Sequence, residues 1–109
     1  MTYAFEKENH MLNDDNFAYL VLAIVEEIPK GKVLTYGILA DMAGYPRNSR
    51  LVGKVLSNSS YYGKYPCHRV VNVNGRLVPG WIEQRSLLEN EGVTFKENGD
   101  VNLKKHLWC

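Results

Sequence analysis

Apolar residues recur with helical spacing in the first third of the chain. Six of them follow one another at i, i+3, i+4, i+7, i+8 and i+11, namely Phe17, Leu20, Val21, Ile24, Val25 and Ile28. This spacing places them on one face of a helix, which we predict to cover residues 15–28. Asp14 or Asp15 can cap its N-terminus, and Pro29 and Gly31 favour its end.

Two shorter helices are predicted in the middle of the chain. After an extended link at 33–34, Thr35 can cap a helix that runs to Met42. The next predicted helix covers residues 47–57, directly after a tight Gly-Tyr-Pro link. Two short helices joined in this way are typical of a helix-turn-helix, with the second as the recognition helix. An ordinary packed helix pair is the alternative.

Basic residues gather on the second of these helices and beyond it. Arg50 and Lys54 lie at i and i+4 and therefore share one helical face. Positions 47–76 contain six basic residues and no acidic one, although the formal net charge of the whole chain is only +1. This distribution fits a polyphosphate backbone as partner, and it fits an ordinary solvated basic face equally well.

The second half of the chain predicts a hairpin, a further helix and an amphipathic tail. The run VVNVNGRLV alternates around Asn74-Gly75, the strongest short signal for a β-hairpin, which would form a wing after the helix-turn-helix. Residues 82–92 have the pattern of a helix that ends at Gly92. We expect the tail at 103–108 to pack back on the core.

Length and composition agree with one globular domain. A chain of 109 residues with 45% apolar and 23% charged residues suits a single core. We predict a mainly α fold with a small β-hairpin wing, a winged helix-turn-helix, over residues 14–109 after a leader at 1–13. No apolar run approaches the ~20 residues needed to span a bilayer, and the leader is too polar for a secretory signal. We therefore expect a cytoplasmic monomer that does not bind membranes, associated with the nucleoid in a bacterium.

The segment YPCHRVV carries the strongest chemical signal. Cys67 is one of only two cysteines and is followed directly by His68 and Arg69. Neither a disulfide framework nor a metal site is expected, because the chain has no CxxC and no paired His/Cys spacing. Nearby cations would favour the reactive thiolate of Cys67, and a carboxylate such as Glu89 or Glu91 would orient the histidine. A buried, inert cysteine is the alternative.

Four blocks of the chain together resemble a known family. IPKGKVLTYGILA, RLVGKVL, PCHRV and LLENEG have the order and spacing of the DNA-binding, catalytic domain of the O6-alkylguanine-DNA alkyltransferases, over about residues 17–95. The resemblance implies a protein that binds double-stranded DNA, flips an O6-alkylguanine out of the duplex and moves the alkyl group irreversibly to a cysteine. It implies no cofactor and no metal at the reacting centre.

The resemblance also implies a role for each matching residue. Cys67 would accept the alkyl group, and His68, through a water, and Glu91 would form the relay that generates the thiolate. The residues implied in DNA or lesion binding are Tyr36, Arg50, Lys54, Arg69, Val70 and Trp81.

For most of this second group an alternative is open. Arg50 would fill the gap in the base stack, or it would only bind phosphate. Tyr36 would support phosphate rotation and proton donation to the flipped base, or it would be a core aromatic. Arg69 fits a brace of the active-site loop better than a DNA contact. The backbone at Val70 would contact the guanine edge, and Trp81 would line the alkyl pocket or pack on the core.

Three features depart from the family pattern. The lesion-closing loop is the short VPGWIEQ, Gln84 replaces a lysine, and Ser59 replaces an asparagine. The short loop and the tail resemble the alkyltransferase-like proteins, which bind O6-alkylguanine without repairing it and hand it to nucleotide excision repair. Those proteins usually carry tryptophan at the position of Cys67. The short loop predicts a roomier pocket that accepts bulky adducts.

The predicted function is a single-turnover methylated-DNA–protein-cysteine methyltransferase that uses Cys67. The alternative is a non-enzymatic lesion sensor that recruits nucleotide excision repair proteins. A transcription regulator with the same fold would bind undamaged DNA sequence-specifically. A cysteine hydrolase would need an oxyanion hole, for which the sequence offers no signal.

Overall fold

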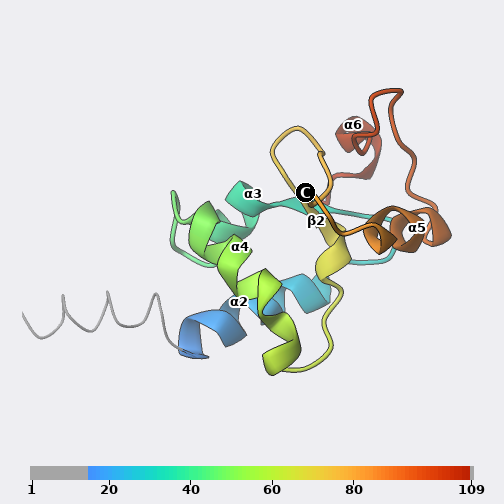
Figure 1. The fold of residues 1–109 in the computed structure, drawn as a ribbon. Helices are drawn as coiled ribbons and strands as arrows, with labels where there is room; N and C mark the ends of the chain where they lie inside the picture. Colours follow the sequence, from blue (N-terminus) through green and yellow to red (C-terminus); the bar gives the residue numbers. More distant parts are fainter. Residues whose placement is uncertain (1–14, 109) are drawn as a thin grey trace, which may run out of the picture.

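Helices dominate the part of the chain that the structure describes, residues 15–108 (Figure 1). In this computed structural model the elements, in chain order, are α2 (Asp15–Glu27), β1 (Leu34–Thr35), α3 (Tyr36–Met42), α4 (Ser49–Ser57), η1 (Ser59–Tyr61), η2 (Cys67–Arg69), β2 (Val70–Val71), α5 (Glu83–Asn90) and α6 (Leu103–His106). The mainly helical fold class with a small sheet is confirmed. The predicted leader, the candidate cap Asp14 and the second cysteine, Cys109, lie outside the described residues.

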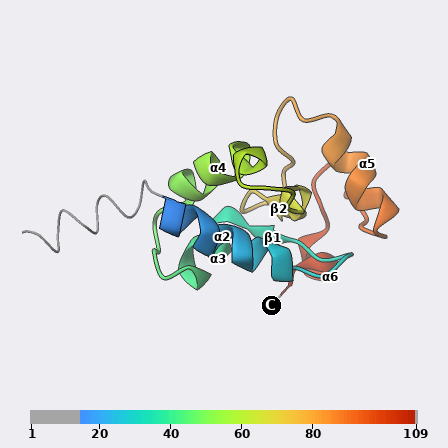
Figure 2. The same ribbon diagram turned by 90° about the horizontal axis from the view of Figure 1, so that it is seen from below.

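The apolar face of α2 packs against both α3 and α4 (Figure 2). Its buried residues are Phe17, Ala18, Val21, Leu22 and Val25, and Ile28 follows just beyond the helix end. The predicted stripe was therefore partly wrong, because Leu20 is 42% exposed whereas Leu22 is fully buried. Apolar residues surround most of α2, so helical spacing alone could not fix which side meets the α3–α4 pair.

The α3–α4 pair forms as predicted, with one shift at its junction. Thr35 caps α3, and its hydroxyl oxygen accepts a hydrogen bond from the backbone N–H of Ile38 at 3.2 Å. Gly44 follows the helix with a φ of +85°. Arg47 also has a positive φ, +70°, so the next helix begins only at Ser49 rather than at 47. Left-handed backbone geometry is incompatible with the first turn of a helix.

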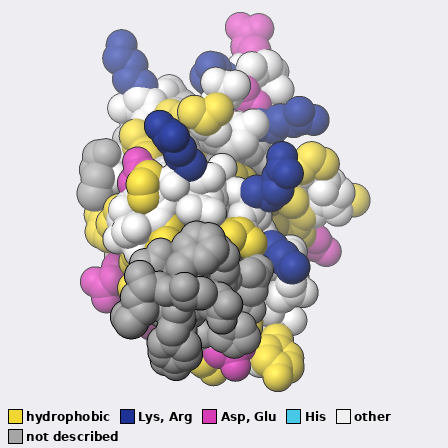
Figure 3. All heavy atoms as spheres, turned by 90° about the vertical axis from the view of Figure 1, so that its left-hand side faces the viewer, with side chains coloured by type: hydrophobic (Ala, Val, Ile, Leu, Met, Phe, Trp, Pro, Cys, Tyr) yellow, Lys and Arg dark blue, Asp and Glu magenta, His cyan; other side chains and the backbone are white. Residues whose placement is uncertain are grey.

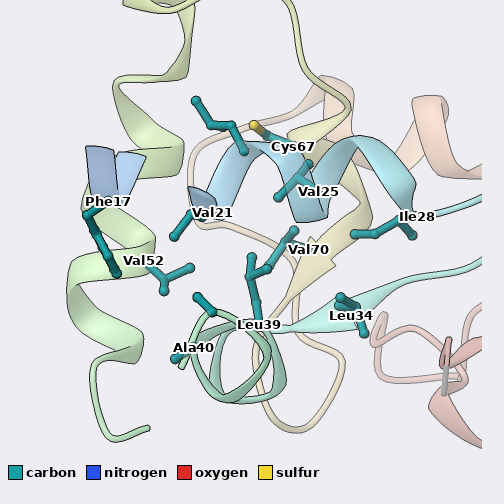
Figure 4. Packing of buried hydrophobic residues seen from close by; sticks show 12 residues of the cluster. Phe17, Val21, Val25, Ile28, Leu34, Leu39, Ala40, Val52, Cys67 and Val70 are labelled. Atoms are coloured by element: carbon teal, nitrogen blue, oxygen red, sulfur yellow. The ribbon is translucent and has the colours of Figure 1, made fainter. Parts of the chain in front are cut away.

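The small sheet joins the middle of the chain to the segment after Cys67. Strands β1 and β2 are parallel, with Leu34 opposite Val70 and Thr35 opposite Val71. These residues are buried in the centre of the core, where Leu34 and Val70 lie near Leu39 (Figure 4). The sheet therefore fixes the residues that follow Cys67 against the start of α3.

The predicted hairpin around Asn74-Gly75 requires a correction. The chain does turn there, but within residues 15–108 no antiparallel strands flank the turn, and β2 pairs with β1 instead. The side chain of Asn72 explains the difference, because its Oδ1 accepts from the backbone N–H of Asn74 at 2.8 Å and of Arg76 at 2.7 Å. A donor used by a side chain is lost to a strand ladder. The backbone oxygen of Gly75 instead accepts from Val101 at 2.8 Å.

The C-terminal tail packs back on the fold as predicted. Val33 donates to the carbonyl of His106 and accepts from the N–H of Trp108, both at 2.9 Å. The ring of His106 is buried, and its Nε2 accepts from the N–H of Thr94 at 2.9 Å. Its Nδ1 lies 3.2 Å from the carbonyl oxygen of Gly31, to which a neutral ring donates. No described helix is long and apolar enough to cross a membrane.

Candidate functional site

A cavity of about 420 Å³ opens between α3, the end of α4 and the segment that contains Cys67. Its wall is mostly apolar and consists of Tyr36, Gly53, Leu56, Ser57, Ser59, Ser60, Tyr65, Cys67, Val78 and Trp81. Three predicted site residues, Tyr36, Cys67 and Trp81, therefore meet in one pocket although they are far apart in sequence. An apolar cavity with a few polar groups is the common form of a small-molecule or base-binding site.

Cys67 forms part of the wall of this cavity. It begins the short helix η2, is 8% exposed and lies beside Val25 of α2 (Figure 4). Burial raises the pKa of the Cys67 thiol, and a hydrogen bond with Ser59 only partly opposes this effect. The free protein thus holds a neutral thiol at neutral pH, rather than the thiolate expected from neighbouring cations.

The basic side chains that follow Cys67, His68 and Arg69, are directed at Glu91 instead. His68 Nε2 lies 2.7 Å from Glu91 Oε2. Arg69 donates from Nε to Oε1 at 2.9 Å and from Nη2 to Oε2 at 2.8 Å. A third bond, from Arg69 Nη1 to the carbonyl oxygen of Ile28 at 2.7 Å, ties the cluster to the end of α2. Arg69 is only 11% exposed, which fits the predicted brace better than a DNA contact.

These contacts set the ionisation of Glu91 and the tautomer of His68. Burial by itself would raise the pKa of Glu91, but hydrogen bonds from Arg69 and His68 outweigh it and lower that pKa to about 2. An ionised carboxylate only accepts hydrogen bonds, so His68 Nε2 carries the proton. In the neutral ring Nδ1 then has a free lone pair, which is the arrangement that a general base requires.

Tyr36 connects the cavity to the basic helix. It is the first residue of α3, and burial, with a further contribution from the charge of ionised Cys67, raises the pKa of its hydroxyl. The hydroxyl is thus a neutral donor at pH 7. A shallower depression beside the cavity, of about 340 Å³, is lined by Tyr36, Ser49, Arg50 and Gly53. The structure therefore places Arg50 at the edge of the pocket.

The predicted basic face lies on α4. Arg50 and Lys54 are both exposed on this helix. Figure 3 views the molecule from the side on which α4 lies in Figure 1, and Lys and Arg side chains project at several places on this surface. Lys54 does not line the cavity, so it is a candidate for contacts with a phosphate backbone and not with a base.

Gln84, which departs from the family pattern, makes hydrogen bonds within the site that the sequence did not reveal. It is fully buried, and its side chain bonds to the backbone of Val78, His68 and Val70. Val70 is itself fully buried, and its carbonyl oxygen accepts from Gln84 at 3.2 Å. Trp81 both lines the cavity and packs against the core, so the two alternatives for it are combined. No local pattern could have shown the bonds of Gln84.

No metal cluster was found in the described part of the chain. Residues 15–108 contain no group of three or more His, Cys, Asp or Glu side chains placed to hold an ion. The side chains of His68 and Arg69, which follow Cys67 in the chain, both bond to Glu91. The side chains of Cys67, His68 and Tyr36 supply a thiol, an imidazole and a phenol to this site.

Comparison with protein families and solved structures agrees with this geometry. The model of the family described as 6-O-methylguanine DNA methyltransferase, DNA binding domain, matches residues 16–93. A relative from Vibrio parahaemolyticus named "DNA base-flipping protein" is 41% identical over 97 residues, which cover 86% of this chain and 97% of the relative. Alkyltransferase-like protein 1 of Schizosaccharomyces pombe is 34% identical over 103 residues, with 86% and 95% coverage.

A solved structure shares the fold over most of its length. It is S. pombe Atl1 in complex with damaged DNA containing O6-carboxymethylguanine. The TM-score is 0.76 at 34% sequence identity, and the match covers 88% of this chain and 97% of that one.

Proposed function

Since the chain belongs to the 6-O-methylguanine DNA methyltransferase DNA-binding domain family, we propose that it binds double-stranded DNA and flips an O6-alkylguanine into the Cys67 cavity. The observation that carries the proposal is the position of this cavity, whose wall contains Tyr36 and Cys67, directly beside the exposed basic helix α4. The names of the similar proteins, a base-flipping protein and an alkyltransferase-like protein, support the same activity.

Base flipping explains why these two features are adjacent. Extruding a base costs a few kcal/mol of stacking and pairing, which protein contacts must offset. Arg50 lies at the edge of the cavity and can occupy the space that the base leaves. Lys54, one turn further along α4, can bind phosphate. The apolar wall formed by Val78 and Trp81 then faces the alkyl group.

We further propose that the flipped base can react with Cys67. His68 Nδ1, through a water molecule, takes the thiol proton, and Glu91 stabilises the imidazolium that results. The sulfur attacks the alkyl carbon, the bond from that carbon to O6 breaks, and its electron pair remains on the guanine. The guanine takes up a proton from the Tyr36 hydroxyl, which is restored from His68. The products are a thioether at Cys67 and an unmodified guanine.

A second candidate is lesion binding without transfer, followed by recruitment of nucleotide excision repair proteins. The raised pKa of the Cys67 thiol favours it, because a neutral thiol is a poor nucleophile. In this case Cys67 would serve only as a small, polarisable part of the pocket wall. The relatives named base-flipping and alkyltransferase-like proteins are consistent with this candidate.

Intact-protein mass spectrometry after incubation with a duplex that contains one O6-methylguanine distinguishes the two candidates. Transfer predicts a stoichiometric gain of one methyl group, located on Cys67 by peptide mapping and absent in Cys67→Ala. The matched control is Cys109→Ser, which should still gain the methyl group. No mass gain together with lesion-selective binding would leave the sensor as the function.

Binding itself is tested with the same duplex and its unmodified counterpart. We expect a lower Kd for the lesion duplex and a Kd for both duplexes that rises steeply with salt. Equal affinity for the two duplexes would refute lesion recognition, and an affinity that is independent of salt would refute the role of the basic face.

A further inference from the structure

Gln84 joins three segments of the candidate site. It lies in the first turn of α5 and is fully buried. Its Oε1 accepts from the N–H of Val78 at 2.7 Å. Its Nε2 donates to the carbonyl oxygens of His68, at 3.1 Å, and Val70, at 3.2 Å. One side-chain amide therefore links a wall of the cavity to the backbone on both sides of Arg69.

The segment at residues 76–82, to which Gln84 bonds through Val78, forms a wall between the Cys67 cavity and a second depression. Val78 and Trp81 line the Cys67 cavity, and the same two residues also line a second depression of about 340 Å³. That depression lies between residues 76–82 and the turn at 98–100. Leu77 and Trp81 pack against the core, but the rest of this segment has open space beside it, so hydrogen bonds contribute strongly to its position. The bond from the N–H of Val78 to Gln84, at 2.7 Å, is shorter than the backbone bond from Trp81 to Val78, at 3.2 Å.

We propose that Gln84 is a positioning residue that sets the distance between the cavity wall at Val78 and the segment at Cys67. It thereby determines how strongly the cavity prefers one O6 adduct over another. The proposal rests on the proposed function, because it assumes that the cavity receives an alkylated base. Gln84 does not touch the base. It acts through the backbone of Val78 on one side and of His68 and Val70 on the other.

The side-chain chemistry explains why an amide is required. The amide accepts one hydrogen bond and donates two, which matches the one N–H and two carbonyl oxygens around it. A lysine at this position could donate to both carbonyls but could not accept from Val78. A glutamate could accept from Val78 but could not donate to the carbonyls. Glutamine in place of the family's lysine at position 84 therefore provides a hydrogen-bond acceptor for the N–H of Val78 in the short loop.

The first test measures, in the absence of DNA, how well the N–H of Val78 is protected by its hydrogen bond to Gln84. Amide hydrogen exchange at Val78 should become about tenfold faster in Gln84→Lys and in Gln84→Met, because each removes the acceptor. Gln84→Glu keeps the acceptor, so exchange at Val78 should stay slow in this variant. Unchanged exchange at Val78 in both Gln84→Lys and Gln84→Met would overturn the proposal.

The second test measures discrimination between adducts. Kd values are compared for duplexes that contain O6-methylguanine, O6-benzylguanine or guanine. In Gln84→Lys we expect the affinity for O6-methylguanine to fall about tenfold, since a mobile wall no longer contacts the small adduct. The affinities for O6-benzylguanine and for guanine should stay unchanged. A parallel fall for all three duplexes would show a merely structural role and overturn the proposal.

The two tests separate this inference from the proposed function. If the wild-type protein binds all three duplexes equally, lesion recognition is refuted and adduct discrimination falls with it. If the wild-type protein prefers the lesion and Gln84→Lys keeps the full preference, only the role of Gln84 is refuted. Should Gln84→Met fail to fold, Gln84→Lys and Gln84→Glu still decide the outcome, because each retains part of the hydrogen bonding.

Discussion

Replacement of Glu91 by glutamine should remove a large, pH-dependent part of the folding free energy. The pKa of Glu91 is lowered from 4.5 to about 2 in the folded protein. At about 1.4 kcal/mol per pKa unit, this shift corresponds to about 3 kcal/mol of stability at neutral pH. The side chain is 11% exposed, so solvent screens these contacts only weakly. In Glu91→Gln, Arg69 also keeps a buried charge without its counter-ion.

The sign of the pH dependence follows from the direction of the shift. A carboxyl whose folded pKa is depressed stabilises the fold fully above its unfolded pKa of 4.5, and it loses this contribution as the pH falls towards about 2. The difference in free energy of unfolding between wild type and Glu91→Gln should therefore be constant from neutral pH to about 5. Below pH 4.5 the difference should shrink by up to about 1.4 kcal/mol per pH unit.

Urea unfolding of both proteins across this pH range measures the difference directly. Glu89→Gln is the matched control, because Glu89 lies in the last turn of α5, just before Glu91, pairs with Arg85 at 3.1 Å and is 50% exposed. An exposed i,i+4 pair contributes at most about 0.5 kcal/mol, so the control should follow the wild type at every pH. A difference for Glu91→Gln that stays the same down to pH 3 would refute the assignment of the low pKa to Glu91.

Three further predictions concern stability and DNA binding. Thr35→Ala should lower the free energy of unfolding by about 1 kcal/mol, measured by urea unfolding, because the N-terminus of α3 loses its cap. Gly75→Ala should cost about 3 kcal/mol, because a Cβ there would lie 2.5 Å from a backbone oxygen at a φ of +89°. Gly80→Ala has a φ of +85° but open space, so it should cost only about 1 kcal/mol in the same assay. Lys54→Gln should reduce the slope of log Kd against log salt by about 1, whereas Lys104→Gln on α6 should leave it unchanged.

Local signals in the sequence were sufficient for the helices. The spacing of apolar residues in 15–28, the Thr35 cap and Gly92 predict α2, α3 and the end of α5 within one or two residues. These features act within a few residues of where they occur, so they require no knowledge of the tertiary fold. The side of α2 that is buried was not predictable, because it depends on where α3 and α4 pack.

Side-chain hydrogen bonds, some of them local and some long-range, account for what the sequence could not provide. Asn72 uses its side chain to close the turn, which prevents the hairpin that Asn74-Gly75 indicates. Arg69 reaches the carbonyl of Ile28, 41 positions earlier, and Gln84 reaches back 14 and 16 positions. Amino-acid patterns do not encode such partners locally. The PCHRV and LLENEG blocks identified the chemical groups and predicted a relay of His68 and Glu91, whereas the two bonds from Arg69 to Glu91 became visible only in the fold.

In that arrangement the Glu91 carboxylate binds both Arg69 and His68. Arg69 is always charged and holds Glu91 through two hydrogen bonds, so the carboxylate remains ionised whether or not His68 carries a second proton. In the proposed transfer, the imidazolium that forms when His68 takes the Cys67 proton would face a fixed negative charge 2.7 Å away. This charge favours the proposed proton transfer by stabilising the imidazolium, whereas burial raises the pKa of the Cys67 thiol and opposes the transfer. The contacts of Glu91 that stabilise the fold would therefore also favour the proposed proton transfer from Cys67, and both properties should weaken together when Glu91 is replaced.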